Sequence, residues 1–221
     1  MKSGYFITGT DTEIGKTTIT AALTHAFQQR GLRVTPIKSL AAGTEADGIN
    51  EDVARLHAVQ TLGLTPEQIC QLVFAEPCAP HIAAQLEGRA IEAAPLLAAI
   101  RATAALGDVA LVEGVGGFRV PLVDGFDTAD LAAQLQLPVI LVVGLRLGCI
   151  NHALLTAEAI RARGLTLAGW VANTADPAMP HVADNLAALA QGLNAPCWGH
   201  VPRFSNPSPA AVAAHLSIPT A

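Results

Sequence analysis

An α/β fold, with a mostly parallel β-sheet and helices on both faces, is predicted by three observations. Short apolar runs that suit strands alternate with helical patterns along nearly all of the 221 residues. Hydrophobic residues make up 51% of the chain but aromatic residues only 4%, so small aliphatic side chains must build the core, as in buried parallel strands covered by Ala-rich helices. No internal repeat or low-complexity block interrupts this alternation. We therefore expect a single domain over residues 1–221.

Composition and charge narrow the class of partner. The net charge is −5, and the 13 Lys and Arg residues form no run, which argues against nucleic acid and anionic membrane as ligands. The longest apolar run, Pro138–Val143, has the length of a strand rather than of a membrane span. Residues 1–4 lead directly into the first strand without a leader pattern, so we expect a cytoplasmic protein that acts on small ligands. The 4 cysteines lack metal-site spacing and are interpreted as reduced and structural.

The first strand, Tyr5–Thr8, leads into the stretch Gly9–Thr17, which reads GTDTEIGKT, and a helix over Thr17–Gln29 follows. Free backbone N–H groups at a helix start attract an anion, Lys16 can reach terminal phosphates, and the Thr17 hydroxyl suits Mg²⁺. Gly9 stands one residue further from the Gly-Lys-Thr triplet than in the usual pattern. The alternative is a plain turn with a surface lysine, but strand, turn, triplet and helix together favour a nucleotide phosphate site and a P-loop NTPase-like fold.

The second strand, Leu32–Lys38, places a lysine at its carboxyl end, where open α/β sheets bind ligands. Lys38 therefore points toward the phosphate loop, or it is a solvated lysine at the start of a loop. After the loop of residues 39–50, a helix is predicted from Glu51 to Leu62. Asp52 in its first turn is either a Mg²⁺ ligand or an acid that complements the helix dipole.

The middle of the chain supplies a second carboxylate. A capping box at Thr65–Gln68 opens a helix, Val73–Pro77 resembles a short strand before a loop around Pro80-His81, and a helix covers Ala93–Leu106. The buried strand Asp108–Val112 then ends at Glu113, our second metal candidate. Gly114, Gly116 and Gly117 allow close approach of the backbone to a ligand, with a tight turn as the alternative.

The last third continues the alternation. We predict a helix over Asp127–Leu135, a central strand over Pro138–Val143, a helix from Gly148 to Arg163, a strand over Leu165–Ala172, a helix over Val182–Gln191 and a strand over Cys197–Val201. The Gly148 helix start is a possible anion site. Asn173 can read a nucleobase edge or can simply end its strand. No chemistry is assigned to the Pro/Ala-rich tail.

Five segments in order resemble the dethiobiotin synthetase family, which makes the ureido ring of a biotin precursor. They are Gly9–Thr17, Phe74–Pro77 with Pro80-His81, Leu111–Gly117, Leu147–Ala153 and Gly169–Asn173. Each segment is of weak to moderate specificity, but together they cover nearly the full length, and GTDTEIGKT is close to a signature of the family. The resemblance implies a homodimeric ATP-dependent cyclo-ligase that converts 7,8-diaminononanoate, CO₂ and MgATP into dethiobiotin, ADP and phosphate.

The resemblance also implies roles for individual residues. The catalytic set is Lys38, Lys16 and Thr12, and Mg²⁺ is held by Thr17, Asp52 and Glu113. ATP binding falls to Glu13, Ile14, Gly15, Lys16, Thr17, Thr18, Asp52, Glu113, Gly116, Asn173, Thr174, Pro202, Arg203 and Phe204. Substrate binding falls to Thr12, Lys38, Ala42, Gly116, Gly117, Gly148, Cys149, Ile150 and Asn151, with the helix start at 148–151 receiving the substrate carboxylate across the dimer interface.

One departure from the family pattern concerns the loop after Lys38. The family usually follows this lysine with Pro and places Ser before the next Gly, but here Ser39 and Ala42 stand at those positions. Ala42 offers no hydroxyl to the substrate, so either the reaction persists without it or the chain is a divergent ligase for a related diamine. A nucleotide-switch ATPase of the partitioning or septum-placement type is the other alternative, although residues 10–14 lack the signature lysine of that class.

Overall fold

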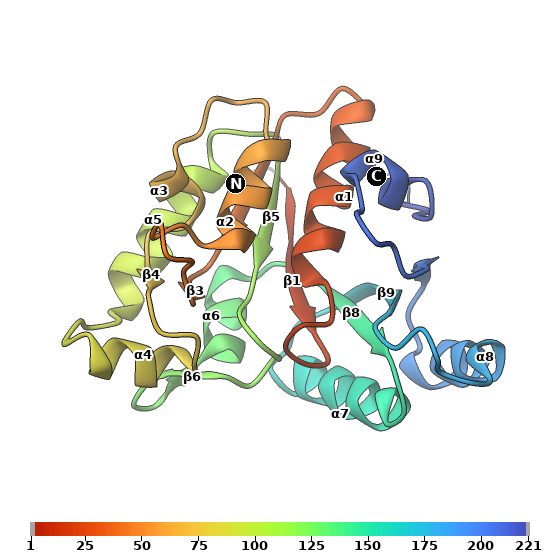
Figure 1. Cartoon of the computed structure of the whole chain (residues 1–221). Coiled ribbons are helices and arrows are strands. Elements are labelled where there is room, and N and C mark those ends of the chain that lie inside the picture. The colour runs from red at the N-terminus through yellow and green to blue at the C-terminus, as the bar shows by residue number, and fades with distance from the viewer. Residues whose placement is uncertain (1–2, 220–221) are drawn as a thin grey trace.

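A wholly parallel sheet forms the centre of the protein (Figure 1). The computed structural model describes residues 3–219, and within them this sheet has six strands. In spatial order they are β10 (Cys197–Val201), β9 (Leu167–Thr174), β8 (Val139–Leu145), β1 (Gly4–Gly9), β5 (Val109–Glu113) and β2 (Val34–Lys38). Because β1 pairs with both β8 and β5, the loop that follows β1 leaves the sheet near its middle.

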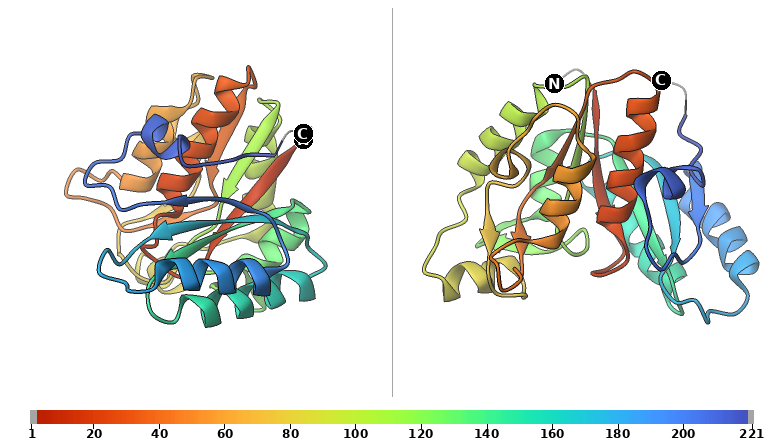
Figure 2. Two further views of the ribbon diagram at one scale, coloured as in Figure 1. Left: turned by 90° about the vertical axis from the view of Figure 1, so that its right-hand side faces the viewer. Right: turned by 45° about the horizontal axis from the view of Figure 1, so that its top comes forward.

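Helices cover both faces of this sheet, as predicted (Figure 2). On one face, α1 (Lys16–Gln29) and the short α9 (Pro209–Ala213) contact each other, and Leu23 and Val212 pack with Ile7 of β1. The other face is covered by α5 (Ala93–Ala104), α6 (Thr128–Leu135), α7 (Cys149–Ala162) and α8 (Val182–Leu193), which pack with Phe6 and Val112. Next to α1 lies α2 (Glu51–Val59). The predicted α/β architecture is therefore confirmed.

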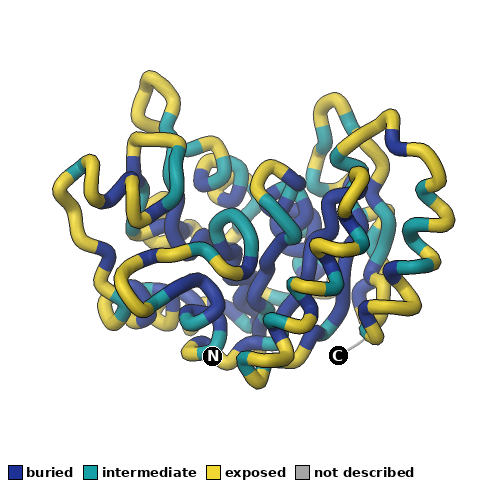
Figure 3. Tube along the Cα trace, turned by 90° about the horizontal axis from the view of Figure 1, so that it is seen from below, coloured by how far each residue is buried: buried dark blue, intermediate teal, exposed yellow. Residues whose placement is uncertain are grey.

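The sheet is the most buried part of the molecule (Figure 3). All residues of β2, β5 and β8 are buried, and most are Val, Ile, Leu or Ala. Strands buried on both faces read as continuous apolar runs, which is why they stand out in the sequence. Among the helices within residues 3–219, none is long and apolar enough to cross a membrane.

Several small elements escaped prediction or differ from it. They are β3 (Ala41–Ala42), which pairs with β4 (Val73–Phe74), α4 (Pro80–Leu86), and the hairpin of β6 (Pro121–Val123) and β7 (Phe126–Asp127). The helix predicted to open at the Thr65–Gln68 capping box is confirmed as α3 (Pro66–Ile69). The predicted loop at Pro80-His81 is instead the first turn of α4, where proline at the first helical position needs no hydrogen bond for its nitrogen. The predicted strand at residues 73–77 is wrong beyond Phe74.

Two strands, β9 and β5, extend further toward their carboxyl ends than predicted. The strand predicted over Leu165–Ala172 was expected to end at Ala172, but β9 extends through Asn173 and Thr174, which pair with Gly144 and Leu145 of β8. Likewise Glu113 is the last residue of β5 and not the first residue after it, since it pairs with Lys38 of β2. The carboxyl edge of the sheet therefore carries Asn173, Glu113 and Lys38 on regular strand backbone.

Candidate active site

The loop between β1 and α1 has the backbone conformation of an anion site. Gly15 takes a left-handed φ of 86° as the residue that caps α1, and a side chain there would lie 2.4 Å from the Asn173 amide nitrogen. No side chain caps the α1 start, which leaves its first N–H groups available to a phosphate. The Thr10 backbone N–H donates to the Val142 carbonyl at 3.0 Å and fixes the loop to β8.

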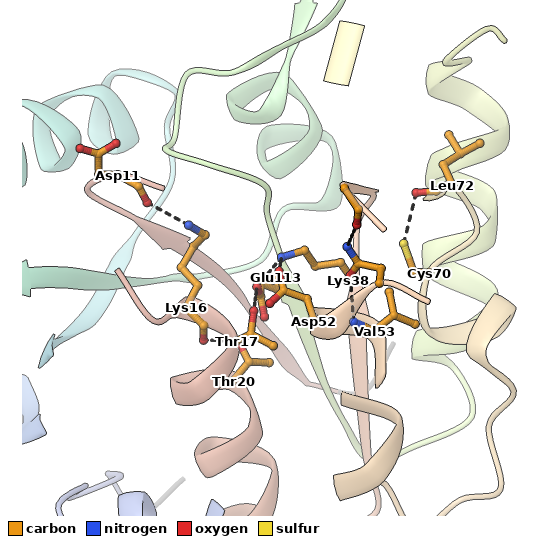
Figure 4. A network of polar contacts seen from close by, with 12 residues as sticks. Asp11, Lys16, Thr17, Thr20, Lys38, Asp52, Val53, Cys70, Leu72 and Glu113 are labelled. Carbon is orange, nitrogen blue, oxygen red and sulfur yellow. Dashed lines mark hydrogen bonds and ion pairs between the residues drawn. The ribbon is translucent and has the colours of Figure 1, made fainter. Parts of the chain in front are cut away.

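Four polar side chains, from two strands and two helices, meet below this loop (Figure 4). Glu113 Oε1 accepts from the Thr17 hydroxyl at 2.7 Å and from Lys38 Nζ at 2.6 Å. The same Lys38 Nζ donates to Asp52 Oδ2 at 2.6 Å. The two residues predicted as metal ligands from separate segments are thus joined through the lysine predicted as catalytic.

Burial and charge set the protonation state of this group. Glu113 is fully buried at 0% exposure and the Lys38 side chain is only 3% exposed, while Asp52 is 42% exposed. Burial by itself would lower the pKa of Lys38, but Glu113 and Asp52 outweigh it, and the pKa of Lys38 rises above its usual value. Burial opposes ionisation of Asp52 as well, and Lys38 nevertheless lowers the pKa of that carboxyl. Lys38 therefore remains a cation at neutral pH.

Lys16 lies across the loop from Lys38 in a different environment. Its Nζ donates to the Asp11 backbone carbonyl at 2.9 Å, and the side chain is 6% exposed. Burial, followed by the positive charge of Lys38, lowers the pKa of Lys16 to about 8. A lysine in this state is stabilised in its charged form by an incoming anion.

The donor set fits Mg²⁺. Glu113 Oε2 is buried and has no hydrogen-bond partner among the described residues, so a carboxylate oxygen is left over for a cation or its water. Mg²⁺ in nucleotide enzymes usually takes one or two carboxylates and completes its shell with phosphate and water. Thr17, Asp52 and Glu113 supply one hydroxyl and two carboxylates. No group of three or more His, Cys, Asp or Glu residues suited to a metal occurs within residues 3–219.

A cavity of about 1100 Å³ joins the loop, this polar group and the end of β9. Most predicted nucleotide and substrate residues line it: Thr12, Glu13, Gly15, Lys16, Thr17, Thr18, Lys38, Ala42, Asp52, Gly116, Asn173, Thr174, Pro202, Arg203 and Phe204. Three other predicted residues, Glu113, Ile14 and Gly117, lie behind the residues that line the cavity. Glu113 is buried below Thr17, the Ile14 carbonyl accepts from the Asn173 amide at 2.8 Å, and a side chain at Gly117 would contact the Gly9 carbonyl at 3.7 Å.

The structure does not bring the predicted carboxylate site to this cavity. Gly148, Cys149, Ile150 and Asn151 begin α7 and are not among the residues that line it. Arg146, two residues earlier than Gly148, forms an ion pair with Asp11 and so connects the segment before α7 to the phosphate loop. Binding of a substrate carboxylate at residues 148–151 stays a prediction.

Several lining residues were missed from the sequence. They are Ala41, Gly43, Thr44, Glu45, Asn50, Glu51, Arg55, Pro77, Cys78, Ala79, Pro80, Val115, Val120, Val201, Ser205 and Pro207. Arg55 carried a detectable signal, because it follows Asp52 by three and Glu51 by four residues and therefore shares their helix face. Gly43 and Thr44 carried none, since their position depends on the long-range pairing of β3 with β4.

Comparisons with known proteins identify the family. A family model described as an AAA domain matches residues 3–210. The ATP-dependent dethiobiotin synthetase BioD of Janthinobacterium sp. (strain Marseille) is 53% identical over 220 residues, which cover 96% of this chain and 93% of that protein. The enzyme of the same name from Pseudomonas aeruginosa (strain UCBPP-PA14) is 54% identical over 218 residues, covering 97% and 96% of the two chains. The chain belongs to the dethiobiotin synthetase family.

Two solved structures share the fold of this dethiobiotin synthetase family member. A ParA family ATPase from Chlorobium tepidum TLS matches with a TM-score of 0.56 at 12% identity, covering 93% of this chain and 86% of the other. The MinC:MinD cell division protein complex of Aquifex aeolicus contains a chain that matches with a TM-score of 0.54 at 15% identity, covering 92% and 82%. At such identities the likeness shows the fold alone. The predicted P-loop NTPase-like fold is confirmed, and the sequence relatives favour the synthetase over the nucleotide-switch ATPase.

Proposed function

We propose that the chain catalyses the ATP-dependent carboxylation and ring closure of 7,8-diaminononanoate to dethiobiotin. The observation that carries this proposal is the placement of two lysines, Lys16 and Lys38, at one cavity, with two carboxylates and a hydroxyl between them. A phosphate-binding lysine alone suits any P-loop protein. A second, buried lysine that stays charged at neutral pH suits a reaction in which another anion must meet the terminal phosphate.

The reaction balances in three steps. One amine of the substrate attacks CO₂, loses a proton and becomes a carbamate. A carbamate oxygen then attacks the terminal phosphorus of ATP, the bond to ADP breaks, and a carbamic-phosphoric mixed anhydride forms. The second amine attacks the carbonyl carbon, phosphate leaves, a proton is lost, and the five-membered ureido ring closes.

The residues act by binding, orientation and charge stabilisation. Lys38 holds the carbamate next to the terminal phosphate, with Thr12 beside it, and Lys16 offsets the charge on the transferring phosphoryl group. Glu13, Ile14, Gly15, Thr17 and Thr18 surround the phosphates. Mg²⁺, held by Thr17, Asp52 and Glu113, supplies charge neutralisation of the phosphates when bound.

The nucleoside and the substrate occupy different ends of the cavity in this proposal. Asn173, Thr174 and the segment Pro202–Phe204 contact adenine, with Gly116 on the phosphate side. Ala42, Gly116 and Gly117 border the diamine. The carboxylate of the diamine is received by residues 148–151 of a second copy, which requires a homodimer. A single domain over residues 1–221 and a cytoplasmic location remain predictions that accord with this scheme.

The experiment that tests the proposal measures ADP release in the presence of MgATP while each co-substrate is omitted in turn. We expect ADP to form at an appreciable rate only when both the diamine and bicarbonate are present. The nucleotide-switch alternative predicts hydrolysis without either, and a divergent ligase predicts that another diamine replaces diaminononanoate.

A further inference from the structure

Arg55 of α2 lines the nucleotide cavity beside Thr18 and has no role in the proposed reaction so far. Its Nη1 donates to the Thr18 hydroxyl at 3.0 Å, and its Nη2 donates to Glu51 Oε1 at 2.5 Å. The guanidinium therefore spans from its own helix to the first turn of α1, directly after Lys16 and Thr17. We propose that Arg55 is a further nucleotide-binding residue that contacts the α-phosphate of the bound nucleotide, an inference that rests on the proposed ATP site.

The position of Thr18 identifies which phosphate lies nearest. In the proposed site Lys16 and Thr17 serve the terminal phosphates and Mg²⁺, and the nucleoside lies toward Pro202–Phe204. Thr18 directly follows Thr17 on α1, and it lines both the cavity and a smaller hollow together with Pro207, which lies three residues beyond Phe204. The α-phosphate joins the nucleoside to the terminal phosphates. It must therefore lie near Thr18 in the proposed binding mode. Arg55 is held against Thr18 and so borders the same point.

The ion pair that Arg55 forms with Glu51 can readily be replaced by a contact with phosphate. Glu51 is 73% exposed and Arg55 is 39% exposed, so their ion pair is screened by solvent and contributes little to stability. A guanidinium has five N–H donors in a planar fork, which allows it to keep the Thr18 contact while it binds phosphate oxygens. Arg55 also borders a smaller hollow of about 120 Å³ beside α9, which gives the side chain room to turn.

The charges of the cavity also favour an additional cation. Lys38 already faces two carboxylates, Glu113 and Asp52, so much of its charge is balanced before any ligand binds. Within the phosphate loop, Lys16 is then the cation that is free to bind the phosphates of ATP. MgATP still carries a net negative charge. Arg55 supplies a further positive charge beside Thr18 in the first turn of α1.

The test measures dissociation constants of MgATP and MgADP by isothermal titration calorimetry, without diamine, for the full-length wild type, Arg55→Ala and Arg55→Lys. We expect Arg55→Ala to raise the dissociation constants of MgATP and MgADP by the same factor, about tenfold. Arg55→Lys should raise them less. Arg33→Ala is the matched control, because it removes an exposed arginine ion pair with Asp108 that lies at the amino end of β2, away from the cavity.

Each outcome decides the proposal. Equal weakening of MgATP and MgADP, with an unchanged thermal midpoint of unfolding, supports the α-phosphate contact. Unchanged affinities, weakening of MgATP alone, or weakening that disappears with 2′-deoxyadenosine nucleotides would overturn it. If the wild type itself binds no nucleotide, the proposed ATP site fails, and this result is distinct from a failure of Arg55.

Discussion

At the scale of single residues, Lys38 is central to the site, because its side chain contacts both carboxylates. Its Nζ lies 2.6 Å from Glu113 and 2.6 Å from Asp52, and it is almost inaccessible to solvent. Burial of an ion pair is no measure of its stabilising value, but removal of one partner leaves the other charge buried. Without Lys38, the carboxylate of the fully buried Glu113 would be left as an unpaired charge.

We therefore predict that Lys38→Met reduces the free energy of unfolding by about 3–5 kcal/mol and kcat by at least about a hundredfold. The double variant Lys38→Met/Glu113→Gln should regain most of the stability, because the buried charge is gone, but none of the turnover. Urea titrations and product assays of both variants check this. Equal instability of the double and single variants would contradict the charge argument.

Lys16 provides a prediction about pH. Its pKa of about 8 means that the ligand-free side chain is charged below pH 8 and neutral above it. Affinity for MgATP should therefore fall as pH rises through about 8, whereas kcat should change less, since bound phosphate holds the proton on Lys16.

Calorimetric titrations of MgATP between about pH 6.5 and 9.5 measure this dependence on the Lys16 pKa. Lys16→Arg is the control, because a guanidinium stays charged throughout this range and should remove the effect. An unchanged pH dependence in Lys16→Arg would assign the titration to another group.

At the scale of elements, the junction of the phosphate loop with β9 depends on one glycine. A side chain at Gly15 would need a left-handed φ of 86° and would displace the Asn173 amide, which approaches to 2.4 Å. Gly164 offers a matched comparison, since its φ is also left-handed, at 71°, and a side chain there meets nothing within 4 Å.

We expect Gly15→Ala and Gly164→Ala to lose similar stability, about 1–2 kcal/mol each from the backbone, while only Gly15→Ala loses nucleotide affinity. Thermal unfolding and MgATP binding of the two variants test this. Retained affinity in Gly15→Ala would show that the loop adapts without the Asn173 contact.

The elements also show how far sequence reasoning extends. The central strands could be predicted because they are buried on both faces and read as uninterrupted apolar runs, as β8 does. The phosphate loop could be predicted because its chemistry depends on consecutive residues. The helix α4, the β6–β7 hairpin and α9 could not, because each is short and is stabilised by packing on distant parts of the chain.

The site follows the same distinction. Lys38, Asp52 and Glu113 could be nominated singly from their places at strand and helix ends, but their mutual contacts follow from the pairing of β2 with β5 and from the packing of α2. The role of Arg55 depends on the contact of α2 with α1, which no local pattern encodes. The helix start at residues 148–151 awaits a second copy of the chain in the proposed scheme.

At the scale of the whole molecule, the parallel sheet orders the proposed reaction by bringing five strand ends to one edge. β1 leads into the phosphate loop, β2 and β5 end in Lys38 and Glu113, and β9 and β10 end beside Asn173 and Pro202. A ParA family ATPase and a chain of a MinC:MinD cell division protein complex share this fold, so the fold alone does not distinguish a nucleotide-switch ATPase from a ligase. The chemistry at the strand ends must do so.

The most direct test of the central claim is detection of dethiobiotin by mass spectrometry after incubation with diaminononanoate, bicarbonate and MgATP. The account predicts product from the wild type in proportion to enzyme, and carbon-13 bicarbonate should place its label in the ureido carbon. Because Lys38 and the phosphate loop supply most of the charge stabilisation, Ala42→Ser should change turnover by no more than about fivefold, the scale of one neutral hydrogen bond. A wild type that binds ATP but yields no dethiobiotin, together with an Ala42→Ser variant that does, would contradict the account.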